Sequence, residues 1–314
     1  MRLLITGGAG FIGTNFVKFL VDKYPDYKIT VLDKLTYAGN IDNIKDLIED
    51  DKIDFVEDDI CDREMICSLM KDCDIVLNFA AESHVDRSIV SADDFIHTNI
   101  KGTYILLDEA RKCSSIKKFV QISTDEVYGS SYDGYSFTEK DILSPSSPYS
   151  SSKASAEMLA FSYFKTYNLP IVITRSSNNY GPYQHSEKFI PTVILNALQD
   201  RKIPIYATGD NVRDWVFVLD NCNAIHTVML KGKNGYAYNI GGGNERRNID
   251  VCKLILKQLG KSQDLIEYVK DRPGHDFRYS INSMKIKVEL GWFPTVDFDH
   301  EGIKKTIEWY SIGK

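Results

Sequence analysis

The chain has 314 residues, of which 26% are charged and 43% apolar, and its formal net charge is −6 at pH 7. This length suits one large α/β domain with a smaller lobe and supplies ample material for a core. The acidic balance, without any block of like charges, argues against a surface that binds nucleic acid. The net charge does not exclude a nucleotide ligand, because a few local Arg and Lys side chains suffice to hold a pyrophosphate.

The cysteines and the N-terminus bear on location. None of the six cysteines has Cys-x-x-Cys spacing, so we expect reduced thiols that mostly pack in the interior, and no metal site is predicted. Met1 leads straight into an apolar strand without a charged leader. No segment approaches the roughly 18 apolar residues of a membrane span. We therefore expect a cytoplasmic protein with no membrane partner.

Short runs rich in Val, Ile and Leu recur along the chain and alternate with amphipathic segments of helical length. The strands predicted in this way cover residues 3–6, 29–32, 54–56, 75–79, 119–122 and 171–174. Strands that are apolar throughout and alternate with helices are typical of a parallel sheet buried on both faces. The predicted fold class is α/β, a doubly wound parallel sheet of the Rossmann type with a smaller C-terminal α/β lobe.

The loop after the first strand contains several glycines, at Gly7, Gly8, Gly10 and Gly13. Their spacing permits a tight turn, close approach of the backbone to a pyrophosphate and close packing of the next helix. Asp33 ends the second strand about 20 residues later, where the dinucleotide fingerprint has an acid that binds the adenosine ribose. That carboxylate would repel a 2′-phosphate and favours NAD over NADP. The adjacent Lys34 could soften the repulsion, and a glycine turn without a ligand is the alternative interpretation.

Thr124, Asp125 and Glu126 follow the fifth predicted strand. An adjacent acid pair can supply a separate proton acceptor and proton donor, which the removal of water requires. The same tripeptide is also good capping chemistry, so an exposed acidic turn or a helix N-cap is the alternative.

Tyr149 and Lys153 lie one helical turn apart and share a helix face. A cation near the phenol, together with the charge of the nicotinamide, would lower the tyrosine pKa from its usual value of about 10. The phenolate could then take a proton from a sugar hydroxyl as hydride leaves. These two residues alone could equally be a solvated pair, but the glycine loop upstream favours the functional interpretation. With the acid pair, they predict an oxidation coupled to a dehydration.

Beyond residue 180 the pattern loosens, and Pro and Gly become more frequent. We expect an NAD-binding Rossmann domain over residues 1–180 and mainly a nucleotide-sugar-binding lobe over residues 181–314. The chain is expected to return to the first domain at about 210–240.

The residues resemble the extended short-chain dehydrogenase/reductases and, within them, the dTDP-glucose 4,6-dehydratases of deoxysugar (rhamnose-type) biosynthesis. Thr-Asp-Glu separates this group from sugar epimerases, which lack the acid pair. The matching segments cover residues 33–40, 80–86, 124–129, 147–153, 178–183, 213–215 and 272–275.

The resemblance implies a reaction cycle. Tyr149 takes the proton of the glucose 4-hydroxyl while hydride passes to NAD, Thr124 helps to hold that hydroxyl, and Lys153 positions the ribose and the phenolate. Glu126 then removes the C5 proton, and protonated Asp125 gives its proton to the departing C6 hydroxyl. NAD is regenerated in each cycle and is tightly bound. For Asp125 to act as an acid near neutral pH, its pKa must be raised.

The resemblance also implies contact residues. The cofactor set is Gly7, Gly10, Phe11, Ile12, Gly13, Asp33, Lys34, Leu35, Thr36, Asp59, Ile60, Phe79, Ala80, Ala81, Ser83, Thr98, Tyr149, Lys153 and Asn179. The substrate set is Ser83, Thr124, Asn178, Lys188, Phe189, Ile190, Pro191, Pro204, Ile205, Tyr206, Arg213, Asn248, Asp271, Arg272 and His275.

Several alternatives stay open at this point. The loop after Tyr206 departs from the family pattern, so a uracil nucleotide competes with a thymine nucleotide. A nucleotide-sugar 4-epimerase would use Tyr149 and Lys153 but not the acid pair, and a non-catalytic NAD-binding protein would need neither pair. The resemblance also implies a homodimer, with residues 103–110 and 154–163 as candidate contact faces.

Overall fold

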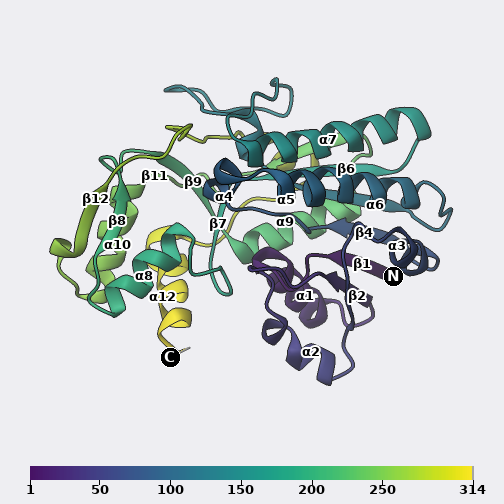
Figure 1. Cartoon of the computed structure of the whole chain (residues 1–314), viewed down its shortest axis with the longest axis horizontal. Coiled ribbons are helices and arrows are strands. Elements are labelled where there is room, and N and C mark those ends of the chain that lie inside the picture. The colour runs from purple at the N-terminus through teal and green to yellow at the C-terminus, as the bar shows by residue number, and fades with distance from the viewer. Residues whose placement is uncertain (313–314) are drawn as a thin grey trace.

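The computed structural model describes residues 1–312, and its centre is a seven-stranded parallel sheet with strand order β10-β6-β5-β4-β1-β2-β3 (Figure 1). All six predicted strands are present, and the predicted fold class is confirmed. The seventh strand, β10, comes from beyond residue 180 and pairs with β6 at one edge. The bounds are β1 (Arg2–Thr6), β2 (Lys28–Asp33), β3 (Asp54–Glu57), β4 (Ile75–Asn78), β5 (Lys118–Thr124), β6 (Ile171–Ser176) and β10 (Tyr236–Ile240).

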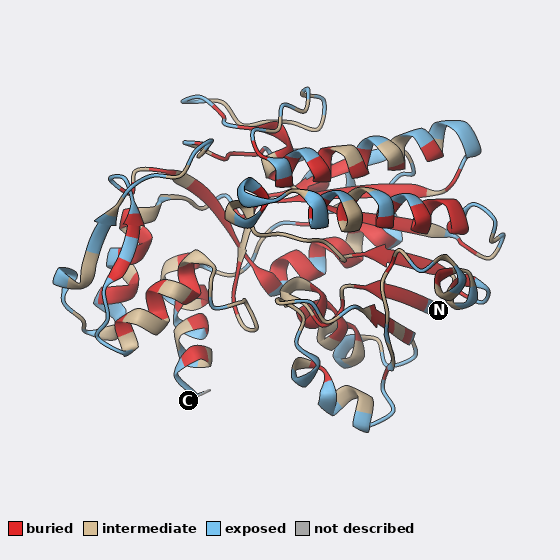
Figure 2. Cartoon of the chain, in the orientation of Figure 1, coloured by how far each residue is buried: buried red, intermediate tan, exposed pale blue. Residues whose placement is uncertain are grey.

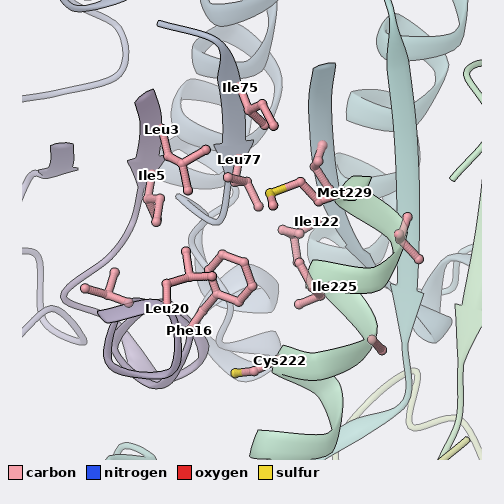
Figure 3. Close-up of a cluster of buried hydrophobic side chains, with 14 of the residues drawn as sticks. Leu3, Ile5, Phe16, Leu20, Ile75, Leu77, Ile122, Cys222, Ile225 and Met229 are labelled. Atoms are coloured by element: carbon pink, nitrogen blue, oxygen red, sulfur yellow. The ribbon is translucent and has the colours of Figure 1, made fainter. Parts of the chain in front are cut away.

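Helices cover both faces of the sheet because side chains along each strand point to alternate faces. Leu3 and Ile5 of β1 belong to one apolar cluster, whereas Leu4 belongs to another. The first cluster includes α1 (Phe11–Lys23), α9 (Val218–Lys231) and α11 (Met284–Leu290). The second includes α3 (Arg63–Met70), α6 (Thr103–Ala110) and α7 (Pro148–Tyr167). Figure 3 shows Phe16 and Leu20 of α1 meeting the side chains of α9 on the first face.

Shorter helical elements connect the strands and the longer helices of this domain. They are η1 (Ile41–Asn43), α2 (Lys45–Glu49), α4 (Val85–Val90), α5 (Asp93–Phe95), the π-helix η2 (Ile96–Gly102) and the 3₁₀ turn η3 (Asp125–Tyr128).

The smaller lobe has its own apolar core, which lies at the left of Figure 1. Its three-stranded sheet has the order β11-β9-β7, and β8 pairs with β12. The strands are β7 (Asn178–Tyr180), β8 (Ile203–Tyr206), β9 (Val212–Phe217), β11 (Glu245–Arg247) and β12 (Ile266–Val269). The helical elements are α8 (Phe189–Leu198), α10 (Asn248–Leu259), η4 (Gln263–Leu265), the π-helix η5 (Phe298–Gly302) and α12 (Ile303–Ile312).

The chain passes between the lobes more than once. After β9, residues 218–240 form α9 and β10 of the large sheet, and α11 packs on the same layer. Figure 2 shows the strands of the large sheet mostly buried, whereas α7 has buried residues on one side and exposed residues on the other. No helix within residues 1–312 is both long and apolar enough to cross a membrane. The six cysteines are free thiols, as expected.

Candidate active site

A cavity of about 300 Å³ lies along the carboxyl ends of the strands of the large sheet. Its wall includes residues from the ends of β1, β2, β4, β5 and β6. The strand order reverses between β1 and β4, and such a switch point is where doubly wound sheets bind ligands.

The glycine loop forms one end of the cavity, and two of its glycines cannot be replaced without a clash. Gly7 has φ +70°, and a Cβ there would lie 2.5 Å from the Ala80 nitrogen. A Cβ on Gly13 would lie 2.2 Å from the Gly7 carbonyl oxygen. Gly10 caps α1 without a side chain, and the first turn carries no acid, so the helix amides there stay available to an anion. The loop therefore fits a pyrophosphate.

Asp33 is held at the end of β2 by two backbone amides. Its Oδ2 accepts from the Ala9 nitrogen at 2.9 Å and its Oδ1 from the Leu35 nitrogen at 2.9 Å. Burial raises the pKa of Asp33, and these two hydrogen bonds oppose the shift. The sequence left open whether Lys34 softens the repulsion between Asp33 and a 2′-phosphate. Its ammonium donates to Asp59 Oδ2 at 2.7 Å. The Lys34 ammonium is therefore paired with Asp59 and not with Asp33.

The acid pair lies on the 3₁₀ turn η3 at the end of β5. Thr124 does act as the N-cap, because its Oγ1 accepts from the Glu126 nitrogen at 3.3 Å. The turn is nevertheless not an exposed acidic one, since Asp125 is only 3% exposed and both acids line the cavity. The three residues Thr124, Asp125 and Glu126 therefore both form the cap and line the cavity.

The surroundings of the acid pair favour protonation. Burial raises the pKa of Asp125 well above its usual range, and the charges of Glu126 and Asp214 add to the rise. Burial also raises the pKa of Glu126, while the positive charges of Arg213 and Arg272 oppose that shift. The two acids are therefore unequal, and Asp125 is the one whose surroundings favour the protonated form more strongly. Its raised pKa agrees with the sequence-based hypothesis.

Helix α7 brings Tyr149 and Lys153 to the same cavity. Ser147 and Ser150 form a capping box at its start, with Pro148 at the first helical position. The Lys153 ammonium donates to the Ile122 carbonyl oxygen of β5 at 2.7 Å. This anchors the helix face to the strand that leads into the acid pair.

The protonation of these two residues differs in part from expectation. Burial lowers the pKa of Lys153 to about 8. Burial, with the negative charges of Glu126 and Asp125, raises the pKa of Tyr149 well above 10.0. The lowering expected from Lys153 is therefore outweighed by the protein surroundings. A phenolate here needs a further positive charge, which the nicotinamide of NAD would supply.

Most of the predicted cofactor residues line this one cavity, the exception being Leu35, whose backbone holds Asp33. Of the substrate set, Ser83, Thr124, Asn178 and Lys188 line it. The side chains of Ile190 and Ile205 lie in the core of the smaller lobe, so only their backbone could face a ligand. The other substrate residues that lie off the cavity wall are Phe189, Pro191, Pro204, Tyr206, Arg213, Asn248, Asp271, Arg272 and His275.

Some of these residues gather around Asp86, which sequence analysis did not single out. Tyr206 donates its hydroxyl to Asp86 Oδ2 at 3.2 Å, and Arg272 donates to Oδ1 at 3.0 Å. The Tyr206 and His275 rings lie 5.8 Å apart. Asp86 is on α4 of the large lobe, so these contacts join the two lobes. Its signal in the sequence was only its place at the end of the matching segment 80–86.

Other cavity residues were missed by sequence reasoning. Glu82, Gln184 and His185 line the wall but follow no spacing rule. Within residues 1–312, six buried polar atoms of the cavity wall have no hydrogen-bond partner, namely Ser123 Oγ, Asp125 Oδ2, Ser177 Oγ, Asn178 Oδ1, Asn179 Oδ1 and Gln184 Oε1. Buried polar atoms normally have partners, so their concentration here fits a polar ligand.

Comparison with known proteins agrees with this geometry. A family model described as GDP-mannose 4,6 dehydratase matches residues 4–306. The chain is 49% identical to low-salt glycan biosynthesis protein Agl12 of Haloferax volcanii, over 99% of this chain and 98% of that protein. It is 47% identical to a dTDP-glucose 4,6-dehydratase of Escherichia coli, over 100% of this chain and 94% of that protein. The structure of DesIV, a dTDP-glucose 4,6-dehydratase from Streptomyces venezuelae with NAD and TYD bound, matches with a TM-score of 0.96 and 45% identity over 99% and 97% of the two chains.

Proposed function

The chain belongs to the GDP-mannose 4,6 dehydratase family, and on this premise we propose that it is an NAD-dependent lyase that converts dTDP-glucose to dTDP-4-keto-6-deoxyglucose. One observation carries the proposal: Asp125, Glu126, Tyr149 and Lys153 line a single buried cavity. A group that takes a hydroxyl proton and a pair that moves protons at the neighbouring carbons are what this dehydration requires. The printed names of the full-length relatives support the same activity.

The first step assigns roles to α7 and to Thr124. NAD, when bound, accepts hydride from C4 of the sugar, returns it to C6 and is regenerated in each cycle. Tyr149 takes the proton of the 4-hydroxyl, and Thr124 holds that hydroxyl. Lys153 carries a positive charge below a pH of about 8 and stabilises the phenolate and the cofactor ribose.

The second step uses the acid pair. The C4 ketone acidifies the C5 proton, and Glu126 accepts that proton. Asp125, protonated because burial raises its pKa, donates a proton to the C6 hydroxyl as the C6–O bond breaks. Water leaves, and Glu126 returns its proton to C5 when C6 is reduced. The proton that Tyr149 took is released and replaces the one that Asp125 gave, so the cycle ends with NAD oxidised and the sugar has lost one water.

The nucleotide is proposed to lie toward the smaller lobe. Arg213, Arg272 and Lys188 bring positive charge near Glu126, and guanidinium groups suit a diphosphate. Tyr206 presents a partly exposed ring beside His275, which suits stacking on a base. The relatives named for dTDP-glucose favour thymine, and UDP-glucose is the alternative substrate.

A 4-epimerase is the second candidate, since it needs Tyr149 and Lys153 in the same cavity. The epimerase reaction gives no role to Asp125. Burial of this carboxyl group beside Glu126 costs free energy, and only the dehydratase reaction gives a reason for that cost. We also propose that NAD is held by residues 1–180 with the returning segment, and the sugar nucleotide mainly by residues 181–314.

Assembly and location are part of the proposal. The outer surfaces of α6 and α7 carry exposed apolar side chains, including Tyr104 and Met158, which a second copy of the chain would cover in a homodimer. Most of residues 103–110 is instead buried within one chain, so the contact face is narrower than the sequence suggested. Six free thiols favour the reducing cytoplasm.

The test is to incubate the purified protein with glucose linked to dTDP or UDP and to follow substrate mass and free NADH together. Loss of one water without net NADH supports the dehydratase, and the faster nucleotide identifies the base. An unchanged mass with an inverted sugar centre would support the epimerase, and binding of NAD without turnover would support neither enzyme.

A further inference from the structure

A buried ion pair lies behind the cavity, between β6 and α7. Arg175 of β6 donates from Nε to Glu157 Oε2 at 2.9 Å and from Nη2 to the same oxygen at 2.6 Å. Their side chains are 4% and 0% exposed. Glu157 follows Tyr149 and Lys153 on α7 at intervals of four residues, so the three share one helix face. The pair therefore holds the helix that carries the oxidation residues.

The same guanidinium also reaches the turn that carries the acid pair. Arg175 Nη1 donates to the Tyr128 hydroxyl oxygen at 2.6 Å, and the guanidinium carbon lies 4.9 Å from the Tyr128 ring centre. Tyr128 ends η3, two residues after Glu126. Its hydroxyl donates to Asn239 Oδ1 at 2.9 Å on the neighbouring strand β10. One side chain thus contacts both the helix and the turn.

Ordinary stabilisation does not explain this arrangement well. A buried ion pair is weak evidence for stability, because desolvation of both charges offsets their attraction. The contacts of Arg175 instead fix the position of helix α7 relative to the turn η3, and these two elements reach the cavity from different parts of the chain. The charge of Glu157 also raises the pKa of Lys153 against the opposing effect of burial. Its negative charge therefore favours the ammonium form that the oxidation uses.

We propose that Arg175 is a positioning residue. Through Glu157 and Tyr128 it fixes the position of Tyr149 and Lys153, the oxidation pair, relative to the acid pair of η3. The inference rests on the proposed function and deepens it. With the links intact, the sugar that Tyr149 has deprotonated at C4 also has C5 and C6 in reach of Glu126 and Asp125. Loosening one link shifts the balance between the two half-reactions and does not merely reduce the amount of active enzyme.

Two substitutions separate the links. Tyr128→Phe removes the hydroxyl that Arg175 contacts and keeps the ring and the Glu157 pair. We expect the NADH held on the enzyme during turnover of dTDP-glucose to rise and product formation to slow by about tenfold, since oxidation continues while elimination lags. Glu157→Gln removes the charge on the helix side. It should lower bound NADH during turnover, because the helix is held less firmly and Lys153 loses a supporting charge.

The matched control is Tyr238→Phe. Tyr238 is buried on β10, where its ring packs in the first apolar cluster, and its hydroxyl donates to Glu289 Oε2 at 3.1 Å. This variant should keep the wild-type fraction of bound NADH. If Tyr128→Phe also keeps that fraction while the wild type dehydrates dTDP-glucose, the inference is wrong and the proposed function stands.

A second readout does not depend on turnover. In the NAD-loaded proteins, the backbone amides of residues 125–129 should exchange with deuterium about fivefold faster in Tyr128→Phe than in Tyr238→Phe, since a lost hydrogen bond of roughly 1 kcal/mol eases local opening by that factor. Equal exchange would overturn the inference even if the wild type showed no activity on nucleotide sugars. A wild type that is inactive while exchange differs would instead overturn only the proposed function.

Discussion

Replacement of Asp125 by Asn separates oxidation from elimination. The amide has the shape and neutrality of the protonated acid, but it cannot give a proton to the departing C6 hydroxyl. Asp125 is 3% exposed and its Oδ2 has no partner within residues 1–312, so solvent water has little access as a substitute donor. A positioned general acid contributes about 10²- to 10⁴-fold, and we expect product formation to fall within that range.

Two measurements check this prediction. Rapid-mixing absorbance should show bound NADH accumulating in Asp125→Asn, because Tyr149 and Lys153 are unchanged and C4 is still oxidised. The free energy of unfolding at neutral pH should change by less than about 1 kcal/mol, since one neutral hydrogen-bonding group replaces another.

The matched control is Asp133→Asn, which alters an exposed acid in the loop after the turn and should leave both rates unchanged. Product formation in Asp125→Asn within a fewfold of the wild-type rate would refute the role of Asp125. A large gain in stability would also count against the reasoning, because it would mean that the wild-type residue is a buried charge.

The remaining predictions concern the cofactor site, the pH dependence and the core. The rate should fall as pH rises through about 8, because Lys153 loses its proton there and the ammonium form is the active one; a profile of kcat/KM that stays flat through this pH would contradict the role of Lys153. Gly7→Ala should abolish detectable NAD binding in calorimetry, because its Cβ would lie 2.5 Å from the Ala80 nitrogen at a backbone φ of +70°; near-normal affinity would show that the loop can shift. Asp33→Ala should weaken NAD binding about tenfold to a hundredfold and reduce the discrimination against NADP, as measured by titration with both cofactors, whereas an unchanged NAD to NADP ratio would argue against a ribose contact. Phe16→Ala should lower the free energy of unfolding by about 3–5 kcal/mol in denaturant titration, since Phe16 is fully buried, and a loss below about 1 kcal/mol would mean that the core collapses around the gap.

Local signals predicted the first half of the fold. The six apolar strands and the glycine loop follow from short-range rules, because parallel strands are apolar throughout and Gly7 adopts a positive φ. Strand β10 was not predicted as a strand, since its pairing with β6 joins residues 236–240 to residues 172–176. Such a pairing across more than sixty residues leaves no local pattern.

The parts of the site that were predictable are those whose residues lie close together in one sequence motif. Tyr149 and Lys153 share a helix face by spacing alone, and both line the cavity that also contains the glycine loop. Whether Asp125 was exposed or buried could not be read from capping chemistry, because burial depends on the tertiary fold. The charge of Asp214, which adds to the rise in the pKa of Asp125, likewise comes from a residue distant in sequence. The contacts of Asp86 with Tyr206 and Arg272 join two lobes and were invisible for the same reason.

The most direct test of the account follows a deuterium label placed at C4 of dTDP-glucose. If Tyr149, Lys153 and the acid pair act in one cycle, the product should have lost one water and should carry the label at C6, because the hydride that leaves C4 returns there. NMR of the product sugar locates the label. A product of unchanged mass with the label still at C4 would contradict the account and would establish an epimerisation in its place.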